Sequence, residues 1–97
     1  MRTMLKVSMP VTAANRAIKD GTLPKIMGAT MEKLRPEAAY FFADGGMRTA
    51  MFVFDMKESS QIPSIVEPYF LNMDAAVQFT PVMNADELKT GLEQAFR

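Results

Sequence analysis

Few side chains in this 97-residue chain could carry out chemistry, and they form no recognisable catalytic pattern. The sequence has no cysteine and no histidine, which excludes thiol nucleophiles, Ser-His-Asp triads, iron–sulfur clusters and zinc or haem sites with these ligands. No pair of carboxylates has a spacing that predicts a metal site. The ten methionines are scattered rather than clustered, which favours pliable core packing over copper binding. We therefore expect no metal and no cofactor.

Lys6 and Tyr40 are the best candidates for acid–base chemistry. A buried lysine loses proton affinity and a buried phenol needs a hydrogen-bond partner, so either could act as a general acid or oxyanion donor. The structural alternative is that Tyr40 is an amphipathic core residue and that Lys6 extends its amine to the rim. The residues expected to line a cavity are Lys6, Ser8, Tyr40, Thr49, Met51, Gln78 and Thr80.

Three charged residues are expected at the rim of this cavity, namely Arg48, Asp55 and Glu67. Asp55 would lie at the end of a strand and Glu67 just before a proline within a helix. Either carboxylate could bind a ligand or a proton. The more ordinary role is pairing with a local amide or with an arginine such as Arg48.

A predicted β-hairpin would position most of these side chains. Residues 38–43 and 49–54 are apolar runs, and they are joined through Asp44-Gly45-Gly46, whose glycines accept the positive φ of a tight turn. A two-residue loop would pair Tyr40 with Met51 and Phe42 with Thr49. Both runs are apolar at successive positions, so both faces of the hairpin should be covered.

The other elements follow from hydrophobic periodicity and capping residues. They are a strand over 2–9, a helix over 13–34 that kinks or divides at 21–24, an amphipathic helix from Ser59 or Ser60 to Met73 that Pro68 kinks or splits, a strand over 75–82, and a short helix after Asn84. Pro81 places the last strand at an edge of the sheet. Asn84 with Glu87 predicts a capping box.

This order predicts an α+β, ferredoxin-like βαββαβ fold with an extra C-terminal helix, in a single domain over residues 1–97. Both main helices would cover one face of an antiparallel sheet whose first and third strands are central. The side chains expected under the helices are Ala39, Phe41, Ala50, Phe52 and Phe54, with Leu5, Val7, Val77 and Phe79. The opposite face, with Tyr40, Phe42, Met51 and Val53, is too apolar to face water as a large patch.

A second copy or an RNA strand could cover that face. RNA-recognition-motif domains share this topology, but the segment 48–55 has Ala50 and Asp55 where two of their third-strand aromatic residues would stand. The net charge is zero, and the basic excess of residues 1–35 is balanced by the acidic excess of residues 36–97, which favours a solvated surface over a nucleic-acid site. We therefore expect a homodimer that packs sheet against sheet as a dimeric α+β barrel, with no nucleic-acid partner.

Several short segments resemble motifs of a family of small, uncharacterised bacterial proteins of the dimeric α+β barrel superfamily. From about Gly21 onward these are Pro36-Glu37-Ala38-Ala39-Tyr40-Phe41, Gly46-Met47-Arg48-Thr49, Ile62-Pro63, Glu67-Pro68-Tyr69-Phe70 and Pro81-Val82-Met83-Asn84. The resemblance implies a homodimer without a defined activity. The superfamily includes cofactor-independent monooxygenases, lactone isomerases, haem enzymes and ligand-binding regulatory domains, and the lack of histidine argues against its haem branches.

We expect a cytoplasmic homodimer whose enclosed cavity binds a small apolar or aromatic molecule. The start of the chain has no apolar run typical of a signal peptide, and no run of eighteen apolar residues predicts a membrane span. Two alternatives stay open, a cofactor-independent monooxygenase or isomerase, and an assembly protein with a packed interface. The residues do not decide whether the protein is an enzyme, because fold-level analogy is weak evidence for chemistry.

Overall fold

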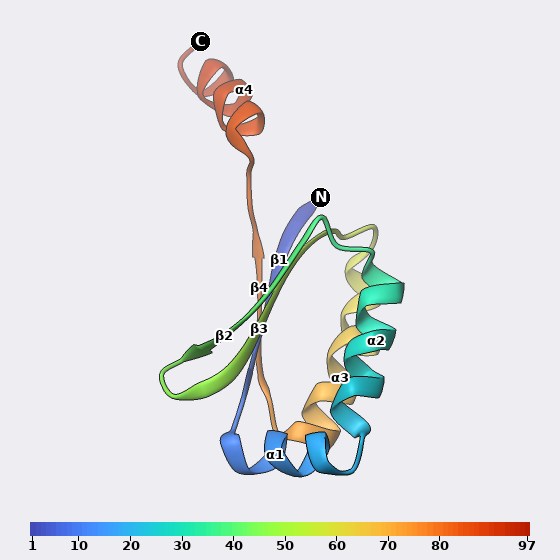
Figure 1. The fold of residues 1–97 in the computed structure, drawn as a ribbon. Coiled ribbons are helices and arrows are strands. Elements are labelled where there is room, and N and C mark those ends of the chain that lie inside the picture. Colours follow the sequence, from blue (N-terminus) through green and yellow to red (C-terminus); the bar gives the residue numbers. More distant parts are fainter.

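A computed structural model describes all of residues 1–97. Its elements in chain order are β1 (Arg2–Met9), α1 (Val11–Lys19), α2 (Thr22–Leu34), β2 (Ala38–Asp44), β3 (Met47–Asp55), a 3₁₀ turn (Ser59–Gln61), α3 (Ile62–Met73), β4 (Ala76–Pro81) and α4 (Ala85–Ala95). The four strands form one antiparallel sheet in the order β2-β3-β1-β4, so β1 and β3 are central as predicted. Helices α1, α2 and α3 lie on one side of the sheet, and α4 projects beyond one end of it (Figure 1). The ferredoxin-like α+β fold is therefore confirmed.

The first helical region divides into two helices. Helix α1 ends at Lys19, and Gly21, with a φ of 83°, precedes the first residue of α2. A positive φ is open to glycine at little steric cost, which is why the chain turns here. The Asp20 carboxylate also accepts a hydrogen bond from the Thr22 backbone N–H at 2.9 Å. Of the two alternatives left open by the sequence, the division is the one observed.

Helix α3 is continuous through Pro68, so the proline does not split it. Proline lacks the N–H that would bond to the carbonyl four residues earlier, which is that of Ser64. The Lys33 Nζ of α2 donates to this carbonyl oxygen at 3.5 Å. The expected cap at Ser59 or Ser60 is wrong, because Glu58 and Gln61 form a capping box around the 3₁₀ turn and α3 begins only at Ile62.

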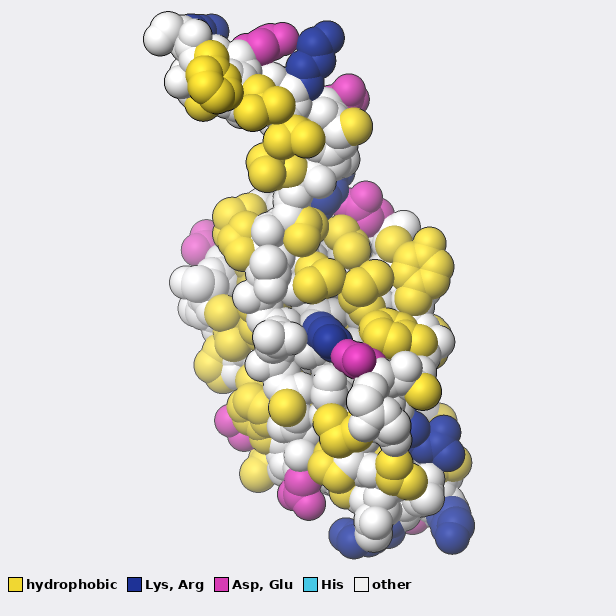
Figure 2. All heavy atoms as spheres, turned by 90° about the vertical axis from the view of Figure 1, so that its left-hand side faces the viewer, with side chains coloured by type: hydrophobic (Ala, Val, Ile, Leu, Met, Phe, Trp, Pro, Cys, Tyr) yellow, Lys and Arg dark blue, Asp and Glu magenta, His cyan; other side chains and the backbone are white.

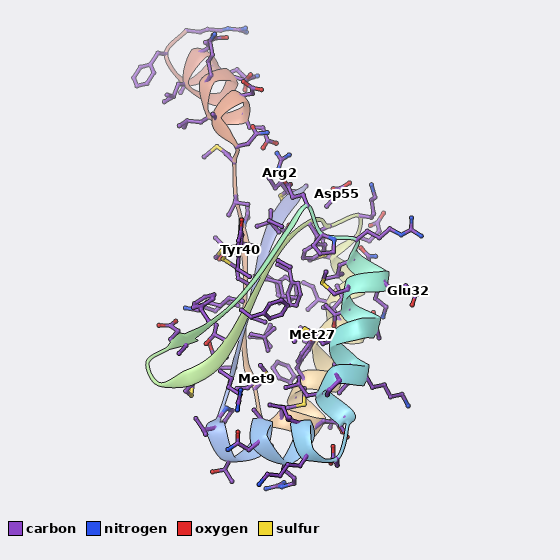
Figure 3. The ribbon with its side chains drawn as sticks, in the orientation of Figure 1. Arg2, Met9, Met27, Glu32, Tyr40 and Asp55 are labelled. Carbon is purple, nitrogen blue, oxygen red and sulfur yellow. The ribbon has the colours of Figure 1, made fainter.

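The core lies between the sheet and the three helices. Leu5, Val7 and Phe52 are fully buried on the sheet side, and Tyr69 and Met73 are fully buried on α3. Figure 3 shows Met9 and Met27 in the space between the sheet and the helices. The helix-facing residues of β1 and β3 therefore lie where alternation predicts.

A buried pair of hydroxyl groups joins α2 to α3 within this core. The Thr30 Oγ1 donates to the Ile26 carbonyl oxygen at 2.9 Å and lies 2.6 Å from the Tyr69 hydroxyl oxygen. A threonine hydroxyl has a single hydrogen, so when Thr30 donates to Ile26 its oxygen accepts from Tyr69, whose hydroxyl also lies 3.8 Å from the weaker acceptor Met27 Sδ. Burial raises the pKa of Tyr69 above its usual value, and the hydrogen bond with Thr30 opposes that rise.

Phe41 is the exception among the residues expected under the helices, because its side chain is 59% exposed. Its ring still packs edge-on against Phe52, with a centroid distance of 6.0 Å and an interplanar angle of 84°. The β2–β3 hairpin bends away from the helices (Figure 1) and leaves a hollow between Phe41 and helices α1 and α2, so no helix covers this ring. The prediction that Phe41 is covered within one chain is therefore wrong.

The hairpin itself forms as predicted. Gly45 and Gly46 have φ values of 60° and 78° and make the two-residue turn. Tyr40 pairs with Met51, and Phe42 pairs with Thr49. This register fixes which side chains share a face of the sheet.

Candidate functional site

The candidate site is the sheet surface that α1, α2 and α3 leave uncovered, which we call the open face. Paired residues of neighbouring strands share a face, so the register defines rows of side chains across the sheet. The rows are Tyr40-Met51-Lys6-Gln78, Ala38-Val53-Met4-Thr80 and Phe42-Thr49-Ser8-Ala76. All seven residues expected to line a cavity belong to these three rows.

The β2–β3 half of the open face is the apolar half. The side chains of Tyr40 and Phe42 are 61% and 42% exposed, while Met51 and Val53 are half-buried. Figure 2 looks onto this side of the molecule and shows hydrophobic side chains gathered there, with few charges among them. The β1–β4 half is more polar, since Ser8, Gln78 and Thr80 belong to it.

An ion pair crosses the open face. The Lys6 Nζ lies 2.5 Å from the Asp44 Oδ2, and the two side chains are 28% and 47% exposed. Strand β3 lies between these residues, so the lysine side chain must extend over it. On β3, Thr49 lies between Met51 and Met47, which are the cross-strand partners of Lys6 and Asp44. Its side chain is only 3% exposed although no helix covers it. The lysine charge is thus already paired within the chain.

Tyr40 and Lys6 occupy the same row, with Met51 between them. Strands lie about 4.8 Å apart, so the backbones of these two residues are separated by roughly 10 Å. A molecule the size of one or two aromatic rings could contact both side chains at once. Neither side chain is enclosed in the single chain, so the buried environment that acid–base chemistry requires would have to come from a covering partner.

The three residues expected at the rim are spread over the molecule. Arg48 donates from Nε and Nη2 to the Asn15 Oδ1 of α1, at 3.2 and 3.1 Å, on the helical side of the sheet. Glu67 is exposed on α3, in the helical layer. Only Asp55, which pairs with Arg2 in the β1–β3 register, lies at the end of the open face.

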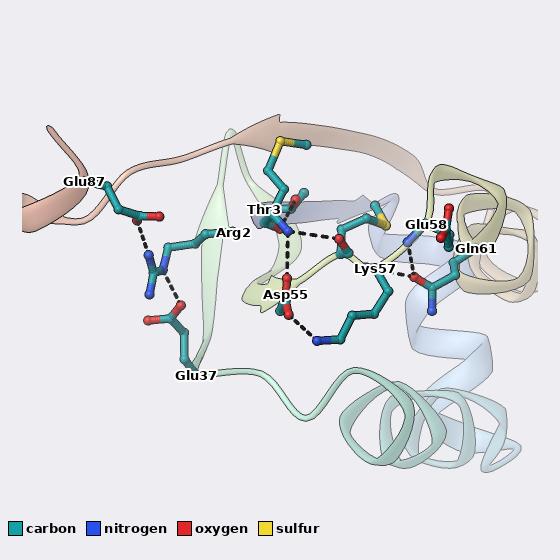
Figure 4. Close-up of polar contacts among 10 residues, drawn as sticks. Arg2, Thr3, Glu37, Asp55, Lys57, Glu58, Gln61 and Glu87 are labelled. Carbon is teal, nitrogen blue, oxygen red and sulfur yellow. Dashed lines mark hydrogen bonds and ion pairs between the residues drawn. The ribbon is translucent and has the colours of Figure 1, made fainter. Parts of the chain in front are cut away.

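The Asp55 carboxylate is held in the ionised form by local cations. Lys57 pairs with its Oδ2, and the N-terminal amine lies 2.7 Å from its Oδ1 (Figure 4). The hydrogen bond from Lys57, with that from the amine second, lowers the pKa of Asp55 to about 2. The partners of Asp55 are therefore Lys57 and the N-terminal amine, rather than the local amide or the arginine that the sequence suggested.

A second charged cluster, which no sequence pattern indicates, lies at the same end of the sheet. Arg2 Nε lies 2.5 Å from a Glu37 oxygen, and Arg2 Nη1 pairs with Glu87 at the start of α4 (Figure 4). Glu87 also accepts a hydrogen bond from the Asn84 backbone N–H at 2.9 Å, and this bond, helped by Arg2, lowers the pKa of Glu87. The cluster fastens the base of α4 to β1. These residues are 35 and 85 positions from Arg2, so no local motif could have revealed them.

Two apolar hollows involve the helical layer, and the second of them also reaches Phe42 and Thr49 at the edge of the open face. One is a groove of about 360 Å³ between α2 and α3, where short side chains such as Ala29 and Ser64 leave space between the helices. The other is a depression of about 500 Å³ between the hairpin and helices α1 and α2, with mostly hydrophobic walls. Neither hollow contains a paired acid and base.

Across the whole chain, no group of three or more carboxylates is gathered closely enough to hold a metal ion. None of the helices has the length and apolar character needed to cross a membrane. No protein-family model matches the sequence, and no curated protein matches it either.

Proposed function

We propose that the protein is a homodimer of the dimeric α+β barrel type, in which two open faces pack against each other and enclose a small apolar or aromatic molecule. The observation that carries this proposal is the composition of the open face. It exposes a contiguous apolar half beside a polar half and contains one ion pair, Lys6 with Asp44. Contiguous exposed apolar patches mark interaction surfaces.

The small core of the single chain supports association. Only 19 of the 97 residues are buried, and several aromatic side chains remain in contact with water. Chains of this size are marginal when they bury only their own apolar surface. A second copy would cover Tyr40 and Phe42. Because each chain has a net charge of zero, no overall electrostatic repulsion opposes the association of two copies.

The mixture of side chains favours a ligand between the sheets. Small-molecule sites combine apolar walls with a few polar groups that fix orientation. Tyr40, Met51 and Val53 would contact an apolar or aromatic body, while Ser8 and Gln78 would bond to polar substituents. Since Lys6 is paired with Asp44, it would meet the ligand as part of a neutral pair.

A cofactor-independent monooxygenase or an isomerase is the enzymatic alternative. The position of Tyr40 and Lys6 in one row favours an enzyme, because two groups that can donate a proton would contact the two ends of one ligand. In that case Tyr40→Phe should abolish turnover of quinol or lactone substrates while leaving the dimer intact, and Lys6→Met should abolish it even at protein concentrations high enough to keep that variant dimeric. Turnover that survives both substitutions would remove these roles.

The test of the dimer is sedimentation equilibrium over a range of protein concentrations. We expect the wild type to dimerise and Met51→Glu to be monomeric, because the new carboxylate would compete with Asp44 for Lys6, and one of the two carboxylates would lose its hydration at the interface without a partner. Leu71→Glu is the matched control, since Leu71 is 78% exposed on α3 and should not affect association. A wild type that stays monomeric at every concentration would refute the proposed dimer.

The test of the cavity is ligand binding by the intact dimer. Titration with a panel of small aromatic molecules, followed by NMR, should shift amide signals of β1 and β3 in the wild type and not in Met51→Glu. A wild-type dimer that binds none of them would favour the assembly alternative, in which side chains fill the interface.

A further inference from the structure

We propose that α4 is an arm that docks on a second copy of the chain, in the apolar depression between the partner's hairpin and its helix α1. The inference rests on the proposed homodimer and names a second, reciprocal contact within it. The occupant is a segment of the same protein, so no other partner is needed.

The first observation is that α4 buries nothing in its own chain. Leu88, Leu92 and Phe96 are spaced four residues apart, lie on one face of the helix, and are 46%, 49% and 84% exposed. An isolated helix of eleven residues is marginal in water and depends on the packing of such a stripe. The capping box of Asn84 and Glu87 begins the helix correctly, so what α4 lacks is a surface to pack against.

The second observation is a receptive surface on the same molecule. The depression of about 500 Å³ is lined by Met9, Val11, Ile18, Leu23, Met27 and Phe41, among others. Three of these side chains, Val11, Ile18 and Phe41, are 45%, 39% and 59% exposed, so the depression is as incompletely covered as the α4 stripe. Apolar surface that remains wet in both places would be removed from water by a single contact.

The geometry makes the contact reciprocal. The hairpin tip and α4 lie at opposite ends of the sheet, as Figure 1 shows, and the apolar side of α4 is turned to the same side of the molecule as the open face, as Figure 2 shows. When two open faces meet about a two-fold axis that crosses the strands, each α4 reaches the hairpin end of the other chain. A two-fold interface of this kind is closed and uses the same two surfaces twice.

Charge also favours this pairing. Helix α4 carries Asp86, Glu87 and Glu93 against a single lysine, whereas α1 beside the depression carries Arg16 and Lys19 and no acidic residue. Opposite charges around an apolar contact select its orientation and suppress wrong pairings. Two α4 helices packed on each other would instead bring like charges together.

Cross-linking between single-cysteine chains tests the contact, because the natural sequence has no cysteine to interfere. Full-length Leu92→Cys is mixed with a size-tagged full-length Ile18→Cys and treated with a short bis-maleimide. We expect the product that contains one chain of each size to dominate. The matched control is Leu71→Cys in place of Ile18→Cys. Leu71 is the more accessible of the two, at 78% against 39%, but it lies on α3, so it should give no such product.

Association constants separate a failure of the arm from a failure of the dimer. If α4 docks as proposed, Leu92→Glu should raise the dimer dissociation constant at least tenfold, and Leu88→Glu should do the same, while far-UV circular dichroism shows the fold intact. A wild-type dimer whose dissociation constant is unchanged by both substitutions, or which cross-links Leu92→Cys chains mainly to each other, would overturn the arm and leave the sheet-to-sheet dimer standing. A wild-type monomer would overturn both.

Discussion

Replacing Lys6 by methionine should weaken the dimer far more than it weakens the fold of one chain. Lys6 pairs with Asp44 at 2.5 Å, and in the single chain their side chains are 28% and 47% exposed. Ion pairs that remain in contact with water contribute about 0.2–1 kcal/mol. We therefore expect Lys6→Met to lower the free energy of unfolding of the monomer by less than about 1 kcal/mol, because the Asp44 carboxylate can return to water.

The cost is larger once the open face is covered. In the proposed dimer the Asp44 carboxylate would lose water as well as its partner, and an uncompensated charge at an interface costs about 2–5 kcal/mol. Since about 1.4 kcal/mol corresponds to a factor of ten, the loss at one of the two equivalent sites in the dimer should by itself raise the dissociation constant roughly 30- to 4,000-fold. Replacing both residues, as in Lys6→Met with Asp44→Leu, removes the stranded charge and should restore most of the affinity.

Sedimentation equilibrium of the wild type, the single variant and the double variant provides the measurement. Urea denaturation of the same proteins on a Val53→Glu background gives the effect on the fold alone, because that substitution also places a carboxylate in the interface but faces Met4 rather than Lys6 across the strands. The reasoning would be refuted by a double variant that dimerises as weakly as Lys6→Met, since the loss would then have another cause. An unchanged dissociation constant in Lys6→Met would show that the ion pair stays in water and that the open faces do not meet around it.

Three further predictions concern the stability of the folded chain. Thr30→Val should lower the free energy of unfolding by about 1–3 kcal/mol, because it leaves the buried Tyr69 hydroxyl without its oxygen acceptor. Tyr69→Phe should lower it by only about 1 kcal/mol, because Thr30 still donates to Ile26. Equal losses in urea denaturation would contradict the assignment of Tyr69 as the donor. Gly46→Ala should cost about 1–2 kcal/mol in thermal unfolding, whereas Gly45→Asn should cost little, since asparagine tolerates a positive φ better than alanine does. The lowered pKa of Asp55 means that the stabilising effect of its carboxylate is complete above its usual pKa of 3.8 and is lost as the pH falls through about 2. Asp55→Asn and the wild type should therefore become equally stable below that pH. A difference in stability that persists there would count against the ion pairs.

The sequence was most informative where a physical constraint is local. Two consecutive glycines and alternating apolar residues determine the turn and the register of the hairpin, and the capping box at Asn84 marks the start of α4. The predicted start of α3 is wrong because Ser59 and Ser60 are favourable caps, while the capping box of Glu58 with Gln61 is an equally local signal that competes with them. Propensity alone does not choose between two adjacent caps.

The candidate site was predictable in part, for a similar reason. Alternation along the strands assigns all seven cavity residues to the open face. It does not say how far a side chain reaches, so the Lys6–Asp44 pair across β3 and the Arg2 cluster with Glu37 and Glu87 required the structure. Phe41 lies on the predicted side of the sheet, but the bend of the hairpin away from the helices leaves it uncovered, and strand alternation does not predict that bend.

The apolar surfaces left in water favour one partner over several. A partner that covered only the open face would leave the stripe of Leu88, Leu92 and Phe96 exposed, and one that bound only α4 would leave Tyr40 and Phe42 exposed. A second copy has both the open face and, at the opposite end, the depression that an apolar helix can fill. One reciprocal association would therefore remove all of these side chains from water at once, and the helix that is marginal by itself would be stabilised by the same event that closes the sheet face.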